Sequence, residues 1–158
     1  MSRQAVELAE AFSQIITDFA ALVESVPDAL WTAPIENDAR PLNFVAYHVG
    51  SSIAFELRIL QAGADGRGSI ITWDDIDAAN ALDADEHADV TRAEALQELR
   101  EHGAAARAVI AGLTDEQLAL VVNVPFLGGQ VTVRQIVEWL LIGHPGMHAP
   151  DIRAAISA

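Results

Sequence analysis

The fold of this chain is decided by the stretch Val131-Thr132-Val133-Arg134-Gln135-Ile136-Val137-Glu138-Trp139-Leu140-Leu141-Ile142-Gly143-His144-Pro145-Gly146-Met147-His148. Thr132 and Gln135 have the spacing of a capping box, in which two side chains bind the free backbone N–H groups at a helix start. Apolar residues then recur at helical spacing, at Val133, Ile136, Val137, Leu140 and Leu141. The pattern predicts a helix that buries one apolar face.

The same apolar face continues into His144 and His148. At about 100° per residue, two positions four residues apart lie about 40° apart on one face of a helix. Two inward imidazoles either share a metal ion or are hydrogen-bonded core histidines. The spacing alone leaves both alternatives open, and a metal site needs a third ligand from elsewhere in the chain.

Pro145 and Gly146 lie between these two histidines, and Pro150 follows them. A proline inside a helix removes one backbone hydrogen bond and clashes with the preceding turn, at a cost of about 3 kcal/mol. We expect the helix either to kink or to end near Gly143 and restart. Either change would alter the spacing of the two imidazoles.

The composition indicates an ordered globular protein. The chain has 158 residues, of which 51% are hydrophobic, so we treat residues 1–158 as a single domain. It has neither an apolar run of membrane-spanning length nor a signal-peptide pattern, and we expect a cytoplasmic protein without a membrane partner. Without cysteine, any thiol chemistry needs an external thiol.

The net charge is −14, and all nine basic residues are arginines. A strongly negative surface repels phosphate backbones, so we expect no nucleic-acid partner. The absence of lysine also excludes catalysis through a lysine Schiff base.

Four principal helices are predicted. The first, over residues 2–26, has apolar positions spaced 4, 3, 4, 3, 4, at Leu8, Phe12, Ile15, Phe19, Leu22 and Val26. The second begins at Pro41 and continues to about Ala62. The third begins at the capping box of Thr91 and Glu94 and ends at Gly112, and the fourth is the C-terminal helix described above.

The segments between these helices are read as connections. Residues 27–40 contain Pro27, Pro34 and Asn37-Asp38, and Trp31 among them is expected to pack on the end of the bundle. Residues 69–90 form a crossover with one short helix from Asp74 to about Leu82. Thr114 and Gln117 start a short helical segment, and residues 121–130 form an extended, glycine-marked approach.

These elements describe an all-α protein, a four-helix bundle with a long crossover between the second and third helices. No strand alternation of any length is visible. A ferritin-like di-iron centre requires Glu-x-x-His on two helices, and this motif does not occur.

Of the three other histidines, only one is placed inward. His48 lies on the second helix among Phe44, Ser52 and Phe55. His87 falls in an acidic run that is read as a solvated loop, with an Asp/His cation site as the alternative; the run contains Asp83, Asp85, Glu86 and Asp89. His102 adjoins Glu101 and is read as peripheral.

Three features together resemble the DinB/YfiT-like superfamily, which includes mycothiol-dependent maleylpyruvate isomerases and bacillithiol transferases. They are the histidine in Arg40-Pro41-Leu42-Asn43-Phe44-Val45-Ala46-Tyr47-His48, the approach Gly128-Gly129-Gln130 into a capped helix, and His144-x-x-x-His148. The resemblance implies an up-up-down-down bundle and a homodimer. It also implies a divalent metal bound by His48, His144 and His148, the same histidines that the helical patterns place inward.

Three imidazoles with open positions are the ligand set of a catalytic metal site, and zinc or nickel suits it best. The resemblance implies a small-molecule substrate and an external thiol such as mycothiol or bacillithiol. The function predicted is a metal-dependent transferase or isomerase that uses this thiol. The alternative is a non-enzymatic dimeric bundle, stress-associated or ligand-binding, whose histidine site stays empty.

No general acid or base stands out in the sequence. Glu56 follows His48 by eight residues, which places it about 80° round the helix; it could approach the site, but a surface or ion-paired role is expected for it. Tyr47 adjoins His48 and should therefore point elsewhere.

Overall fold

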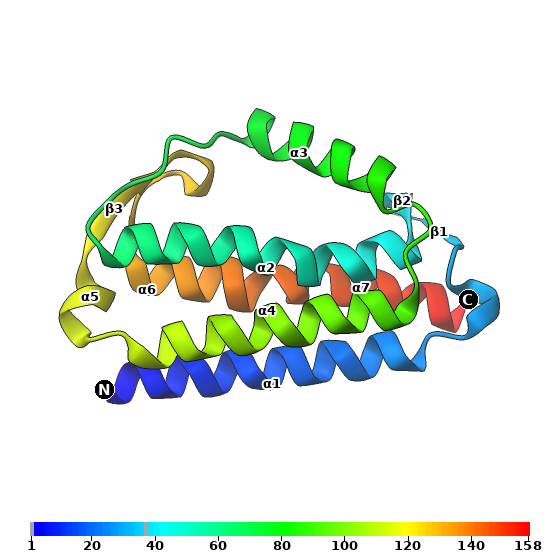
Figure 1. Ribbon diagram of the computed structural model, residues 1–158, viewed down its shortest axis with the longest axis horizontal. Coiled ribbons are helices and arrows are strands. Elements are labelled where there is room, and N and C mark those ends of the chain that lie inside the picture. Colours follow the sequence, from blue (N-terminus) through cyan, green and yellow to red (C-terminus); the bar gives the residue numbers. More distant parts are fainter. Residues whose placement is uncertain (1, 37) are drawn as a thin grey trace.

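Four long helical rods lie side by side in the computed structural model, which describes residues 2–36 and 38–158 (Figure 1). The rods are α1 (Arg3–Ser25), α2 (Leu42–Ala64), α4 (Arg92–Gly112) and a C-terminal rod. The C-terminal rod consists of α6 (Val133–Ile136), a π-helical segment (Val137–Ile142) and α7 (Gly143–Ser157). The all-α four-helix bundle and its long crossover are therefore confirmed.

The directions of the rods differ from the expected order. Arg92 at the start of α4 donates to the carbonyl of Val26 just after α1, so these two helices are antiparallel. The start of α2 is tied to the start of α4 through Asn43 and Ala88, so these two are parallel. With α1 taken as up, the order is up-down-down-up (Figure 1), and the up-up-down-down prediction is wrong.

The lengths of the connections explain this order. The short segment between α1 and α2 can only return the chain beside the helix it has left, which makes α1 and α2 antiparallel. The crossover after α2 contains α3 (Trp73–Glu86), which carries the chain back to the end where α2 began. The next helix, α4, therefore runs parallel to α2.

The parallel pair α2 and α4 packs unusually closely at one glycine. A Cβ atom placed on Gly50 would lie 2.6 Å from the backbone nitrogen of Leu99. Such a distance is a clash with atoms that cannot move independently of α4, so glycine is required there. The close contact fixes the height at which α2, and with it His48, sits in the bundle.

Capping boxes start most of the later helices. The three predicted from sequence are confirmed, at Thr91 and Glu94 for α4, Thr114 and Gln117 for α5 (Asp115–Ala119), and Thr132 and Gln135 for α6. A further box of Thr72 and Asp75 starts α3, which is longer than the predicted segment from Asp74 to Leu82. It was missed because its acidic residue is Asp rather than Glu or Gln.

Two short hairpins correct the expectation that the chain has no strands. One pairs β1 (Pro34–Ile35) with β2 (Asp38–Pro41), and Asn37 of the predicted connection lies outside the described residues. The other pairs β3 (Val121–Val124) with β4 (Gly129–Thr132) through a turn in which Gly128 and Gly129 have φ values of 95° and 110°. Strands of four residues or fewer are too short to leave a visible alternation in the sequence.

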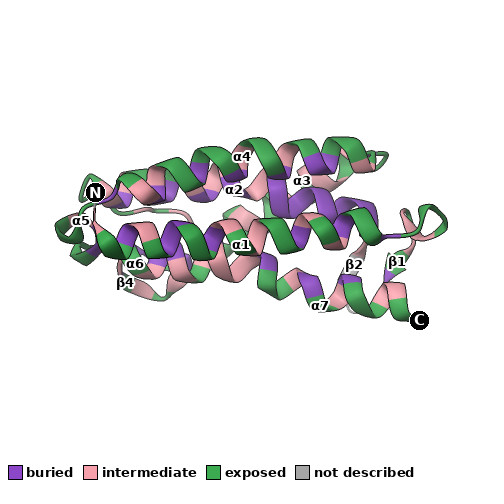
Figure 2. Cartoon of the chain, turned by 90° about the horizontal axis from the view of Figure 1, so that it is seen from below, coloured by how far each residue is buried: buried purple, intermediate pink, exposed green. Residues whose placement is uncertain are grey.

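Buried residues lie along the helices of the bundle (Figure 2). The inward faces of the four rods carry most of the core, whereas no residue of α3 is buried.

Trp31 packs near the start of α4 as expected, because its indole N–H donates to the carbonyl of Val90 at 2.9 Å. Within the described residues, no helix has the length and apolar character needed to cross a membrane.

Candidate metal centre

The C-terminal rod accommodates Pro145 without breaking. The segment Val137–Ile142 is a π-helix, and regular α-helix resumes at Gly143, two residues before Pro145. A π-helical turn shifts the backbone hydrogen bonds by one residue, so the missing N–H of Pro145 falls where the bonding pattern changes. The helix therefore neither kinks nor restarts as expected; it widens locally to a π-helical turn. His144 and His148 remain one helical turn apart on α7.

The structure brings His48, His144 and His148 together from two helices. Each offers one nitrogen, and these three atoms lie within 4.8 Å of one another. The ring centroids form a nearly equilateral triangle, with separations of 5.0, 5.4 and 4.9 Å. The rings meet edge-on at 65° to 88°, so their edges rather than their faces converge.

Glu56 orients His144. Its Oε1 lies 2.7 Å from Nδ1 of His144, and the glutamate is only 4% exposed. A carboxylate at this position accepts the Nδ1–H and leaves the lone pair of Nε2 directed away from it. That Nε2 lies 3.0 Å from Nε2 of His148. The predicted surface role of Glu56 is thus wrong, whereas an ion-paired role agrees with the geometry.

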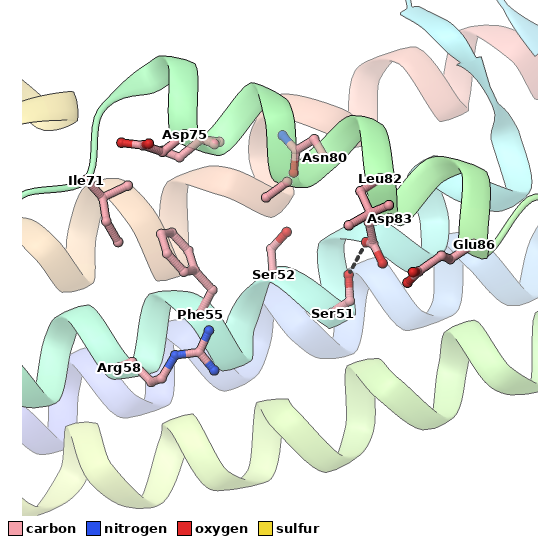
Figure 3. Close-up of a pocket in the computed structure, with 12 residues that line it drawn as sticks. Ser51, Ser52, Phe55, Arg58, Ile71, Asp75, Asn80, Leu82, Asp83 and Glu86 are labelled. Atoms are coloured by element: carbon pink, nitrogen blue, oxygen red, sulfur yellow. Dashed lines mark hydrogen bonds between the residues drawn. The ribbon is translucent and has the colours of Figure 1, made fainter.

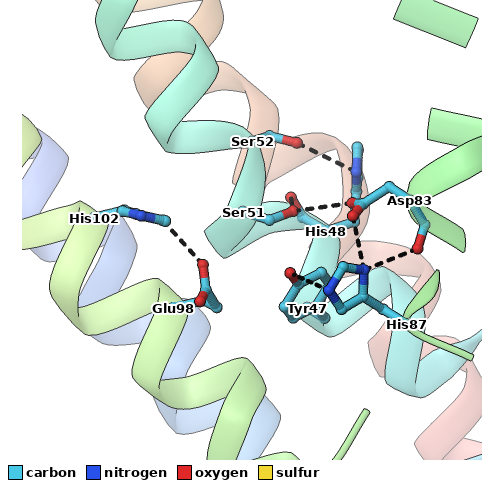
Figure 4. Close-up of polar contacts among 8 residues, drawn as sticks. All are labelled: Tyr47, His48, Ser51, Ser52, Asp83, His87, Glu98 and His102. Atoms are coloured by element: carbon cyan, nitrogen blue, oxygen red, sulfur yellow. Dashed lines mark hydrogen bonds and ion pairs between the residues drawn. The ribbon is translucent and has the colours of Figure 1, made fainter. Parts of the chain in front are cut away.

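His48 is oriented by its own helix. It is 5% exposed, its ring stacks on that of Phe44 at 5.8 Å, and its Nδ1 lies 3.2 Å from the hydroxyl of Ser52 (Figure 4). The contact with Ser52, one turn later on α2, engages Nδ1 of the His48 ring. Stacking and hydrogen bonding together leave the ring little freedom to rotate.

The arrangement fits a divalent metal on two counts. Nitrogens about 2.05 Å from a tetrahedral ion lie about 3.3 Å apart, so the His144–His148 pair at 3.0 Å needs to open by only a few tenths of an ångström. The second oxygen of Glu56, Oε2, is buried and makes no hydrogen bond to the described residues. A negative charge held so close to three imidazoles is stabilised when they surround a cation.

A pocket of about 490 Å³ lies beside this centre, between α2 and α3 (Figure 3). Its walls are mostly apolar, and Ser52 belongs both to the pocket lining and to the contact with His48. The pocket could not be predicted from the sequence, since α3 has no buried face that would mark it as one wall.

A second polar cluster lies near His48 (Figure 4). His87 is 3.0 Å from the hydroxyl of Tyr47 through Nε2 and 2.8 Å from Asp83 through Nδ1. The prediction that His87 and Asp83 belong to a solvated loop is therefore wrong, because Asp83 is in α3 and both residues are half-buried. Tyr47 does point away from the metal centre, as expected. Burial, and next the negative charge of Asp83, raise the pKa of Tyr47 to about 12.

His102 is separate from both clusters. Its Nδ1 lies 3.1 Å from the carbonyl of Gly50 and 3.3 Å from Glu98. The residue therefore links α4 to α2 at the edge of the bundle. This placement agrees with the peripheral position expected for it.

The fold and the histidine cluster define a class of helical bundles with a candidate three-histidine centre, and sequence comparison identifies the family. The family model of the DinB superfamily matches residues 11–152, so the chain belongs to that superfamily. No curated protein matches it significantly.

Two solved structures share the fold. One is YfiT from Bacillus subtilis, described as a probable metal-dependent hydrolase with an unusual four-helix bundle topology. It has a TM-score of 0.79 and 16% identity, over 98% of this chain and 87% of YfiT. The other is the mycothiol-dependent maleylpyruvate isomerase, with a TM-score of 0.71 and 14% identity, over 94% of this chain. This chain spans 60% of the isomerase, and at these identities the likeness is one of fold.

Proposed function

We propose that this protein is a metal-dependent enzyme in which His48, His144 and His148 bind a divalent ion, zinc or nickel, and which transfers or isomerises a small substrate with an external thiol. The observation that carries the proposal is the convergence of three imidazole edges within 4.8 Å, beside a buried carboxylate. Two of the nitrogens are already spaced almost as one ion requires.

The protein residues would prepare the centre before any substrate arrives. Glu56 holds His144 in the tautomer whose Nε2 can bind a metal, and Ser52 holds the ring of His48. A divalent ion with neutral imidazoles and the Glu56 carboxylate leaves one net positive charge, which suits one bound anion.

The metal would supply Lewis acidity, which lowers the pKa of a bound thiol or water and so produces a nucleophile near neutral pH. An external thiol is favoured because the chain has no cysteine of its own. The isomerase that shares the fold is described as mycothiol-dependent, which supports the same assignment. Hydrolysis, in keeping with the description of YfiT, is the competing reaction of the same centre.

The test starts with metal analysis of untagged protein beside a His48→Ala, His144→Ala double variant. We expect about one zinc or nickel ion per wild-type chain and none in the variant. His102→Ala is the matched control, because that imidazole lies outside the centre. No metal in the wild type, even after incubation with both ions, would contradict the proposal and favour a non-enzymatic bundle.

Activity then separates the two reactions. Mycothiol, bacillithiol and glutathione are each assayed with a bimane electrophile, and a nitrophenyl ester reports hydrolysis without a thiol. Thiol transfer that is lost on chelation and in His148→Ala supports the proposal. Transfer that survives both treatments would rule out a metal-bound thiolate, and ester cleavage alone would assign a hydrolase.

A homodimer, which the family resemblance implies, stays a prediction. Light scattering on the purified full chain tests it directly. A monomer would leave the metal centre intact, because all three histidines and Glu56 come from one chain.

A further inference from the structure

We propose that the pocket between α2 and α3 binds the substrate of the metal centre as an elongated monocarboxylate, with its carboxylate at Arg58 and its reactive end at Ser52. The inference rests on the proposed function and extends it to a substrate class. Three features of the pocket carry it: a shared residue, a single basic side chain, and an acidic opposite end.

The shared residue is Ser52, which locates the reactive end. Its hydroxyl lies 3.2 Å from His48 and its side chain lines the pocket (Figure 3). A molecule that fills the pocket therefore reaches the part of α2 that carries the first metal ligand.

Arg58 supplies the only basic side chain among the residues that line the pocket. Its guanidinium carbon lies 5.9 Å from the centre of the Phe55 ring, which keeps the charged group at the pocket edge. A guanidinium binds a carboxylate through two parallel hydrogen bonds. Arg58 follows Ser52 by six residues, or about 9 Å along the axis of α2, which sets the length of the substrate.

The opposite end of the pocket is acidic and gives the substrate one orientation. Asp83 and Glu86 of α3 lie beside Ser51, away from Arg58 (Figure 3). A second carboxylate placed there would be repelled, so a monocarboxylate fits in one direction only. Asp75 also lines the pocket, but it accepts from the backbone and hydroxyl of Thr72 in the capping box.

The middle of the pocket selects an apolar body. Phe55 is the apolar side chain of the α2 wall, and four aliphatic residues lie on the other wall: Ile71, Ile76, Ala79 and Leu82. A volume of about 490 Å³ holds a molecule of small-metabolite size. The expected substrate is therefore an amphipathic acid with its anionic group remote from the reacting atoms.

Calorimetric titration with two probes of equal length tests this inference. The probes are 4-phenylbutanoate and its neutral analogue 4-phenylbutan-1-ol, with both zinc-loaded and chelator-treated full-length protein. We expect the acid to bind at least about fivefold more tightly than the alcohol, as for one solvent-exposed charge-assisted pair. The preference should persist without metal, which excludes direct binding of the carboxylate to zinc.

Two variants assign the preference to a residue. Arg58→Gln should abolish it, whereas Arg67→Gln, at an exposed arginine paired with Asp65, should leave it unchanged. Both positions are exposed, so neither substitution threatens folding. Equal binding of acid and alcohol, no binding of the acid at millimolar concentration, or a preference that survives Arg58→Gln would each overturn the inference.

A dicarboxylate tests the orientation. We expect 4-(4-carboxyphenyl)butanoate to bind more weakly than 4-phenylbutanoate to the wild type, and Glu86→Gln to recover part of the loss. Equal binding of the two acids would overturn the predicted direction. Bound metal without an acid preference would refute this inference and leave the proposed function standing. An Arg58-dependent preference in protein that binds no metal would refute the proposed function and leave only the carboxylate site at Arg58.

Discussion

Two histidine clusters adjoin neighbouring residues of α2, His48 and Tyr47, and differ in what the imidazole nitrogens face. In the first, nitrogens of His48, His144 and His148 face one another across less than 4.8 Å. In the second, the two nitrogens of His87 face oxygens, those of Tyr47 and Asp83. Tyr47 and His48 are neighbours in sequence, so one turn of α2 supplies both clusters.

The difference shows what distinguishes a candidate metal centre from a histidine whose nitrogens are both hydrogen-bonded within the protein. An imidazole whose two nitrogens are bonded to a phenol and a carboxylate has its hydrogen-bonding capacity satisfied by the protein. Three imidazoles that present nitrogens to one another have more acceptor than donor capacity at their meeting point, which a cation relieves. The first cluster has one carboxylate for three imidazoles, whereas the second has one carboxylate for one imidazole.

The largest expected effect comes from removing one imidazole from each cluster. His144→Ala should lower zinc affinity by more than roughly a hundredfold, because the site loses one of its three ligands, the one that Glu56 orients. His87→Ala should leave zinc affinity unchanged. Competition titration against a zinc-binding dye measures both, and equal losses in the two variants would erase the distinction between the clusters.

The two carboxylates provide the next comparison. Glu56→Gln should reduce zinc affinity by about 10- to 100-fold, since it weakens the hydrogen bond that orients His144. Asp83→Asn, the matched change in the second cluster, should not affect zinc binding. If Glu56→Gln binds zinc as the wild type does, the carboxylate has no role in preparing the ligand.

Tyr47 allows the second cluster to be observed by itself, because it is the only tyrosine in the chain. Its tyrosinate absorbance should appear with a midpoint near pH 12 in the folded protein and near pH 10 in denaturant. A pKa raised by folding stabilises the protein below the unfolded value, and this contribution is lost as the pH rises through the folded value.

The same shift predicts an alkaline loss of stability. Between pH 9 and pH 11 the wild type should lose about 1.4 kcal/mol of unfolding free energy more than Tyr47→Phe, which cannot ionise there. Urea unfolding at the two pH values measures this. Equal losses of unfolding free energy in the two proteins would show that folding does not raise the pKa of Tyr47.

The smallest effect concerns the attachment of α3. Asp83→Asn weakens the contacts of the α3 C-terminus with His87 and Ser51, and we expect a loss of stability of about 0.5–1 kcal/mol. Faster hydrogen exchange should be confined to residues 73–90. Unchanged exchange rates in the rest of the chain serve as the internal control. Faster exchange throughout the chain would mean that the bundle itself depends on this contact.

The helices and their starts follow from local sequence. Capping boxes and apolar spacing depend on residues three or four positions apart, so they predicted α1 and α4 nearly to the residue and the starts of α5 and α6. The box of Thr72 and Asp75 has the same spacing and could have been found with Asp allowed at its last position. His48, His144 and His148 were selected because they end or join apolar faces.

The order of helix directions and the polar contacts could not be obtained in this way. Glu56 looked peripheral on its own helix, and only the approach of α7 turns it into the partner of His144. His87 looked solvated until Tyr47 and Asp83 enclosed it. Both outcomes depend on how two helices are rotated and offset, which the spacing along one helix does not specify.

The sequence by itself therefore determined the all-α class, the helix starts and the three inward histidines, because each depends on neighbours within a turn or two. The tertiary structure decided the up-down-down-up order, the π-helical segment before Pro145 and the pairing of Glu56 with His144. These features are set by packing between segments that are distant in the chain, such as the close contact of Gly50 with Leu99.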